Sequence, residues 1–152
     1  MNPVLKPGGI ADLPQVMRVM ETAFERRFGE GWTIAQCAGL LPMSGVWLTT
    51  ARLDDEFVGF SLSRVIVDEA ELLLLAVDPS RRRRGVGKSL LLHFLESARQ
   101  RGAVRVHLEV RDGNGAVELY QQSGFKLSGR RRGYYTGEDG DVYDALSLSR
   151  IP

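Results

Sequence analysis

Apolar residues recur every three to four positions in two long stretches, which predicts two amphipathic helices. The first follows Asp12 and ends before Gly29, and its apolar face consists of Leu13, Val16, Met17, Met20 and Phe24. The second begins at Val86 and ends before Gly102, and its apolar face includes Leu90, Leu91, Phe94, Leu95 and Ala98. Two shorter helices are expected, one after the capping residue Thr33 and one over residues 116–122.

Extended patterns fill the rest of the chain. Residues 46–53 and 57–67 flank the polar turn 54–56, which predicts a hairpin. Residues 71–77 read ELLLLAV, an unbroken apolar run typical of a central strand buried on both faces. Further strands are expected over residues 4–6, 104–110, 125–131 and 142–148. The resulting order, β-α-α-β-β-β-α-β-α-β-β, predicts a mixed α/β layer, and no repeat or linker divides residues 1–152, so a single domain is expected.

The composition is that of a globular domain, with 43% hydrophobic and 26% charged residues among 152. A net charge of +1 excludes a global field that would attract nucleic acid or a membrane surface. Cys37 is the single cysteine, and the sequence shows neither a leader nor an apolar run near the roughly 18 residues of a membrane helix. We therefore expect a cytoplasmic protein with a reduced, structural thiol and no membrane partner. His93 and His107 lack ligand partners at useful spacing, so no metal site is expected.

The segment most informative about chemistry joins the buried strand to the long helix and reads RRRRGVGKS over residues 81–89. Its two glycines let the backbone pass close to a bulky anion, and the free N–H groups and positive dipole end of the helix favour a pyrophosphate. The phosphate loop of nucleotide triphosphatases is excluded because it needs glycine five residues before Gly87, where Arg82 stands. A dinucleotide fingerprint is excluded because a third glycine at the right spacing is missing.

This loop, Arg82-x-x-Gly85-x-Gly87 preceded by LLLLAVDP, resembles the acetyl-CoA pyrophosphate loop of the GNAT superfamily of N-acetyltransferases. The second half of the chain strengthens the likeness. Four of its segments, LEVR at 108–111, ELYQQSGF at 118–125, RRRGYY at 130–135 and YDALSL at 143–148, resemble the branch that acetylates the N-terminal alanine of ribosomal proteins. The resemblance is close over residues 70–149 and loose in the N-terminal half.

The resemblance implies a three-layer α/β fold, in which helices cover both faces of a mixed, mostly antiparallel, twisted sheet of about seven strands. The sheet would splay between the strand ending at Val77 and the strand from Val104, so that acetyl-CoA enters the gap. The residues implied in cofactor binding are Leu75, Ala76, Val77, Arg82, Arg83, Arg84, Gly85, Val86, Gly87, Lys88, Ser89, Asn114 and Tyr120. Family members commonly place an asparagine seven residues before the tyrosine, whereas Asn114 stands six before Tyr120.

The resemblance also assigns two proton movements in amide formation. Glu109 is the candidate base, acting directly or through water, because an α-amine is mostly protonated near neutral pH. Tyr120 is the candidate acid for the leaving thiolate, and the backbone N–H of Val77 or a neighbour would stabilise the thioester oxygen. The residues alone favour structural roles. Glu109 would be a solvated carboxylate paired with Arg111 or Arg105, and Tyr120 would be an aromatic residue at the edge of the core. The resemblance reverses that preference.

On the acceptor side, the resemblance implies that Trp32, Tyr134 and Tyr135 hold the first residue of a protein or peptide N-terminus. The sequence therefore predicts an acetyl-CoA-dependent Nα-acetyltransferase acting on a ribosomal-protein alanine. The alternatives are a lysine side chain or small-molecule amine as acceptor, a non-catalytic acetyl-CoA-binding module, and plain cross-strand packing of the two tyrosines. The basic run 130–132 is more typical of a solvated strand than of nucleic-acid binding.

Overall fold

A seven-stranded sheet forms the centre of the computed structural model, which describes residues 2–152. Its spatial order is β1-β2-β3-β4-β5-β7-β6, and every neighbouring pair is antiparallel except β4 and β5. The strands are β1 (Val4–Gly8), β2 (Val46–Leu53), β3 (Glu56–Ile66), β4 (Glu69–Val77), β5 (Arg105–Arg111), β6 (Lys126–Thr136) and β7 (Val142–Arg150). The expected mixed, mostly antiparallel sheet is confirmed.

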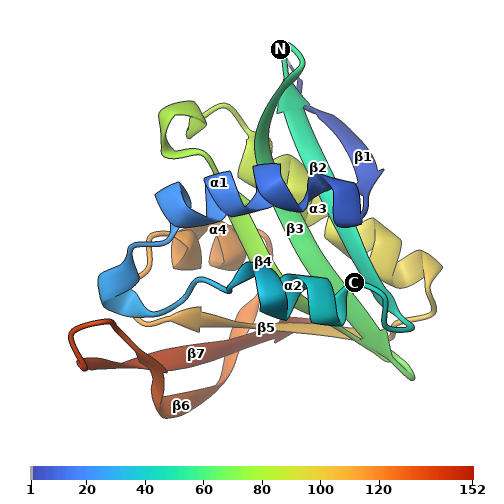
Figure 1. Ribbon diagram of the computed structural model, residues 1–152. Coiled ribbons are helices and arrows are strands. Elements are labelled where there is room, and N and C mark those ends of the chain that lie inside the picture. Colours follow the sequence, from blue (N-terminus) through green and yellow to red (C-terminus); the bar gives the residue numbers. More distant parts are fainter. Residues whose placement is uncertain (1) are drawn as a thin grey trace.

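Helices cover both faces of this sheet, as expected (Figure 1). On one face lie α1 (Leu13–Ala23) and α2 (Ile34–Leu40), and on the other lie α3 (Val86–Gln100) and α4 (Ala116–Gln122). Three short 3-10 turns, Ile10–Asp12, Arg26–Phe28 and Pro79–Arg81, had no signal in the apolar pattern. Within residues 2–152, none of the helices combines the length and apolarity needed to cross a bilayer.

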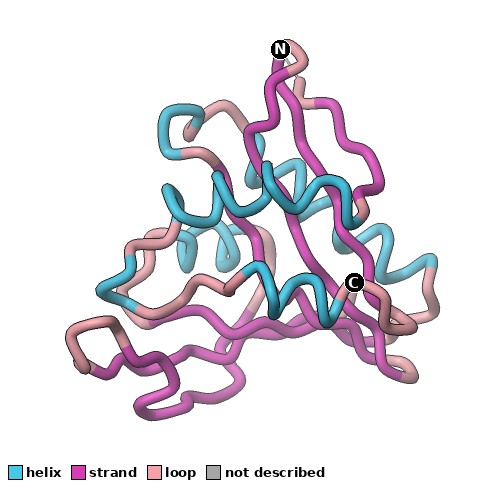
Figure 2. The backbone as a smooth tube through the Cα atoms, viewed as in Figure 1, coloured by secondary structure: helices cyan, strands magenta, loops and turns pink. Residues whose placement is uncertain are grey.

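The element boundaries differ from the predicted ones mainly in the last two strands. Strand β6 continues to Thr136, five residues beyond its predicted end, because two register shifts let it stay paired with β7. In Figure 2 these strands extend past the main sheet as a long hairpin. In the predicted hairpin of β2 and β3, the second strand ends at Ile66, one residue earlier than predicted, and Val67 belongs to the turn that leads to β4, with a backbone φ of +58°.

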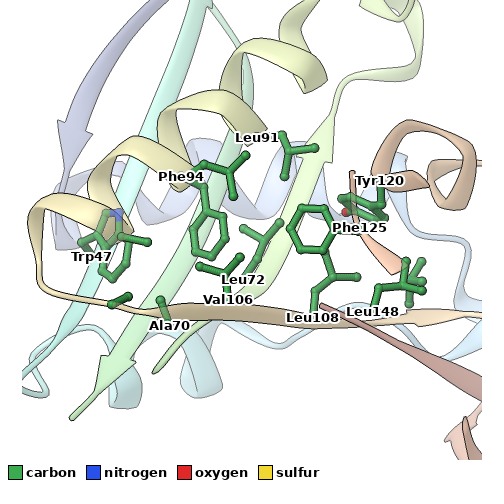
Figure 3. Close-up of a cluster of buried hydrophobic side chains, with 14 residues drawn as sticks. Trp47, Ala70, Leu72, Leu91, Phe94, Val106, Leu108, Tyr120, Phe125 and Leu148 are labelled. Atoms are coloured by element: carbon green, nitrogen blue, oxygen red, sulfur yellow. The ribbon is translucent and has the colours of Figure 1, made fainter. Parts of the chain in front are cut away.

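The larger core cluster lies between the sheet and the α3 and α4 side. It is built from α3 residues such as Leu91 and Phe94 packed on Leu72, Val106 and Leu108 of the parallel pair (Figure 3). A second cluster, on the α1 side, contains Leu74 and Ala76 of the same strand. The predicted burial of the ELLLLAV strand on both faces is therefore confirmed.

Strand β4 changes which side chains face which layer at one residue. Leu72 pairs with Ser63 and Leu74 pairs with Leu62, so Leu73 is an extra residue, a β-bulge. The parallel pairing with β5 stops at the same place, because Leu72 opposite Leu108 is its last matched pair. Beyond Leu72 the two central strands are no longer bonded to each other, which is the predicted splay.

Candidate active site

The gap between the splayed strands holds a cavity of about 530 Å³. Its walls are the β4 residues Leu72–Val77 and the β5 residues Leu108–Val110. The loop before α3 borders one end, and the other parts of the lining include Glu30, Asn114, Tyr120 and Tyr135. The backbone of Leu74–Val77 pairs with β3 on one side only, so its opposite edge presents unpaired N–H and C=O groups to the gap.

The loop before α3, at the mouth of the cavity, begins with a hydrogen-bonded turn. Asp78 accepts hydrogen bonds from the backbone N–H of Ser80 at 3.0 Å and from its hydroxyl at 2.8 Å. These bonds lower the pKa of Asp78 below its ordinary value. Gly85 then starts α3 with a left-handed φ of +77° and no side-chain cap, and a Cβ there would meet no atom within 4 Å. The first helical N–H groups thus have no side-chain cap, and Gly85, Val86 and Gly87 line the cavity, as an anion site requires.

The four consecutive arginines separate into different roles. Arg81 lines the cavity but is engaged in an ion pair with Glu56 across the turn. Arg82 and Arg83 line the cavity together with Lys88, whereas Arg84 and Ser89 are not among the lining residues. Arg83 also takes a positive φ of +65°, which is uncommon for a residue with a side chain. Besides the Arg81 ion pair, the cavity mouth therefore carries three cationic side chains near the helix N-terminus.

Glu109 lies on β5 with its side chain only 11% exposed and lines the cavity. Its Oε1 is 3.2 Å from Nε of Arg131 on β6, and its Oε2 accepts a short hydrogen bond from the Ser147 hydroxyl on β7. The partners named from sequence, Arg111 and Arg105, bond elsewhere, to Glu30 and to the Ser149 hydroxyl. The carboxylate is thus oriented from the two strands beyond β5.

Tyr120 projects from α4 into the same cavity and is 5% exposed (Figure 3). Its ring packs edge-on against Phe125 with centroids 6.0 Å apart. Burial, and to a smaller extent the negative charge of Glu30, raises the pKa of Tyr120 above its ordinary value. At neutral pH the hydroxyl carries its proton, which is the protonation state that a general acid requires.

The amino-acid sequence matches the acetyltransferase (GNAT) family over residues 13–125, most of the chain. This chain belongs to the GNAT acetyltransferase family. The protein is therefore an N-acetyltransferase with acetyl-CoA as its acetyl donor.

Similar proteins include two named [ribosomal protein bS18]-alanine N-acetyltransferase. The one from Salmonella typhimurium is 42% identical over 100 residues, which cover 63% of this chain and 68% of the relative. The one from Haemophilus ducreyi is 32% identical over 142 residues, covering 86% and 98%. Among solved structures, the ribosomal-protein-S18-alanine N-acetyltransferase from Escherichia coli superposes with a TM-score of 0.86 at 28% identity, covering 99% of this chain and 94% of that one.

The residues around the cavity of this GNAT acetyltransferase fit acetyl-CoA. An unpaired β4 edge suits an amide-containing pantetheine arm, since it offers the backbone groups that a further strand would use. The uncapped start of α3, beside Arg82, Arg83 and Lys88, suits a diphosphate. Of the thirteen residues predicted to bind the cofactor, Arg84 and Ser89 are the two outside the cavity lining.

The three predicted acceptor-side aromatics are not equivalent in the acetyltransferase. Tyr135 lines the cavity, and burial followed by the charge of Glu30 raises its pKa. Tyr134 is 49% exposed, packs edge-on against Tyr135 and lies outside the lining. Trp32 packs against the core cluster on the α1 side. Substrate contacts by Trp32 and Tyr134 stay predictions.

One residue of the acetyltransferase's cavity escaped sequence reasoning altogether. Glu30 lies in the segment between α1 and α2, its side chain is 8% exposed, and it lines the cavity. Its partners, Arg111 and Asn114, are more than 80 residues away in the chain. The flanking Gly29 and Gly31 only signalled a helix end, so the local pattern contained no sign of a buried carboxylate.

Proposed function

We propose that this enzyme acetylates the α-amino group of a protein N-terminus, and that its acceptor is the N-terminal alanine of ribosomal protein bS18. The observation that carries a catalytic role is that Glu109 and Tyr120 line one cavity together with the cationic mouth at the start of α3. The choice of acceptor is supported by the relatives from Salmonella typhimurium and Haemophilus ducreyi, whose names state that activity. An acceptor on the ribosome would place the enzyme in the cytoplasm.

In the proposed reaction, bound acetyl-CoA supplies a thioester as the acetyl source. Glu109 takes a proton from the acceptor ammonium, directly or through a water molecule, which leaves the free amine needed for attack. Arg131 and Ser147 hold the Glu109 carboxylate in place for this step. Attack of the amine forms the C–N bond, and the N–H of Val77 or a neighbour on the open β4 edge supports the carbonyl oxygen. As the C–S bond breaks, Tyr120 donates its proton to the departing sulfur, and the second proton of the attacking nitrogen returns to Tyr120, which leaves a neutral amide and a free thiol.

The acceptor end of the cavity favours a chain terminus over a side chain in the middle of a polypeptide. Beside the lining residues Glu30 and Tyr135, the segment before α2 packs directly on the tip of the β6–β7 hairpin. A Cβ on Gly29 would collide with the carbonyl of Thr136, and one on Gly137 would collide with the carbonyl of Arg27. The N–H of residue 138 donates to the carbonyl of residue 26 at 3.1 Å, which closes this seam. A covered acceptor end admits a slender N-terminus more readily than a lysine flanked by chain on both sides.

The test is acetyl transfer followed by mass spectrometry. One peptide begins with a free alanine and contains no lysine, and its partner has a blocked N-terminus and one lysine. A gain of one acetyl group on the free-alanine peptide alone is the expected outcome. Transfer to the blocked peptide alone would identify a lysine side chain as the acceptor. Transfer to neither peptide would indicate a small amine as acceptor or a non-catalytic acetyl-CoA-binding module. A measurement of acetyl-CoA binding would then show whether the protein binds the cofactor at all.

A further inference from the structure

Glu30 connects the acceptor side of the cavity to the cofactor side. Its Oε1 accepts a hydrogen bond from Nε of Arg111 at 2.8 Å, and its Oε2 accepts one from Nδ2 of Asn114 at 2.7 Å. Arg111 ends β5 and Asn114 precedes α4, so the two elements that carry Glu109 and Tyr120 both meet this carboxylate. Both carboxylate oxygens accept hydrogen bonds, so the side chain is held in a fixed position.

The contact to Asn114 orients that side chain toward α4. The Nδ2 of Asn114 donates to Glu30, and its Oδ1 accepts a hydrogen bond at 2.8 Å from the N–H of Ala116, which is the first residue of α4. Gly115 at the N-cap position has no side-chain cap, so Asn114 performs that function. Ala116 and Tyr120 stand one helical turn apart, and both line the cavity.

The contact to Arg111 anchors the segment before α2. The guanidinium lies 3.6 Å from the ring centroid of Phe28, and Phe28 packs edge-on against Tyr143 of β7 with centroids 5.2 Å apart. Arg111 is therefore held by two residues of one short segment, the ring of Phe28 and the carboxylate of Glu30. A cation buried between an aromatic face and a carboxylate is a strong, directional attachment.

We propose that Glu30 is a positioning residue of the transfer reaction. Through Asn114 it sets the start of α4 and hence the place of Tyr120, and through Arg111 it holds the acceptor-side segment against the end of β5. In this proposal Glu30 acts only through Arg111 and Asn114, and the acceptor's proton goes to Glu109. The inference rests on the proposed function only for the choice of acceptor peptide.

An exchange of polarity tests this inference. In Glu30→Gln the new amide can accept from Arg111 but no longer accepts from Asn114, and in Asn114→Asp two carboxylates face each other at the same place. The double variant re-forms all three bonds. Its amide at position 30 donates to the carboxylate at position 114, whose other oxygen still accepts the N–H of Ala116. Glu25→Gln is the matched control, since Glu25 lies in the same segment but pairs with the exposed Arg27.

The first readout is hydrogen exchange at the α4 amides in the protein without substrates. We expect the Ala116 amide to exchange about tenfold faster in E30Q and in N114D, a change of about 1.4 kcal/mol, and to recover in the double variant. The second readout is steady-state kinetics with the free-alanine peptide. We expect kcat/KM for the peptide to fall about ten- to hundredfold in each single variant and to recover in the double variant, while E25Q stays within about twofold of wild type.

Three results would overturn the inference. Unchanged α4 exchange in E30Q would show that Glu30 does not act through Asn114. A double variant whose Ala116 exchange and kcat/KM are no closer to wild type than those of N114D would exclude the paired geometry. Because the double variant re-forms the three bonds, this comparison also tests the inference when one single variant fails to fold. A loss of kcat above about a thousandfold in E30Q with normal exchange would make Glu30 the base instead. If wild-type enzyme leaves the peptide unmodified, the proposed acceptor fails, while the exchange experiment still decides the role of Glu30.

Discussion

Replacing Tyr120 by phenylalanine removes one hydroxyl and leaves the rest of the side chain in place. The ring is 5% exposed and keeps its edge-on contact with Phe125, so packing is preserved. The pKa of Tyr120 is raised by burial and by the charge of Glu30, with no contribution from a hydrogen bond. We therefore expect Y120F to fold normally, with a free energy of unfolding within about 1 kcal/mol of wild type.

The kinetic effect should be much larger than the effect on stability. A positioned general acid contributes about 10²- to 10⁴-fold to a rate, which corresponds to about 2.7–5.5 kcal/mol of activation free energy. Because the proton is needed only when the thiolate leaves, the loss should fall on kcat. The dissociation constant for acetyl-CoA should change little, because most of the residues predicted to bind the cofactor lie on the α3 loop and β4, away from the Tyr120 hydroxyl.

The assay is steady-state acetyl transfer to the free-alanine peptide, with acetyl-CoA affinity measured separately by calorimetry. Tyr143→Phe is the matched control, since Tyr143 lies outside the cavity lining and its edge-on ring contact with Phe28 does not use the hydroxyl. We expect Y120F to lose at least about a hundredfold in kcat and Y143F to retain wild-type kcat. Full turnover by Y120F would show that another group, or water, protonates the leaving sulfur.

Other consequences can be measured on the same protein. Glu109→Gln should lower kcat by about a hundredfold or more with a small change in stability, because Arg131 in its ion pair is 61% exposed; turnover equal to wild type would exclude it as the base. Gly137→Ala should raise the peptide KM about tenfold, because the new Cβ would push the β6–β7 hairpin away from the segment before α2. Gly39→Ala is the control and should leave KM unchanged: neither glycine has a positive φ, but a Cβ at position 39 would meet open space. Val67→Gly should raise the free energy of unfolding by about 0.5–1 kcal/mol, because Val67 is 91% exposed and held at a φ of +58°; a lower midpoint of urea unfolding would refute strain there. Above about pH 10 the tyrosines of the unfolded chain ionise, whereas the raised pKa of Tyr120 keeps that side chain neutral in the folded protein. The free energy of unfolding should therefore fall as pH rises, and its slope should be steeper in wild type than in Y120F by up to about 1.4 kcal/mol per pH unit. Parallel slopes would contradict that assignment.

The features that sequence reasoning could predict are those encoded by neighbouring residues. Helix α3 begins at Val86 as predicted, because its apolar period and Gly85 both mark that boundary. The α3 loop could be assigned to an anion because glycines, arginines and a helix start stand together within nine residues. Tyr120 and Glu109 could be assigned only through the resemblance, since neither has a local signature of catalysis.

The contacts that were not predicted join residues distant in sequence. Strand β7 lies between β5 and β6, so the partners of Glu109 come from the last two strands of the chain and not from β5 itself. Arg111 lies on the same face of β5 as Glu109, yet it bonds Glu30 because the segment before α2 crosses the end of that strand. No periodicity within one strand can reveal which neighbour a sheet will supply.

The bulge at Leu73 connects the fold to the site. Leu72 and Leu74 are two positions apart and in a regular strand would face the same layer, but Leu72 packs under α3 and Leu74 packs under α1. The extra residue therefore reverses which side chains face which helix layer, and both halves of one apolar run stay buried. Because parallel pairing with β5 ends at Leu72, the bulge also lies where the β4 edge becomes free. The bulge at Leu73 thus marks the point on β4 where the strand edge becomes free, and that free edge suits an amide-containing acetyl donor.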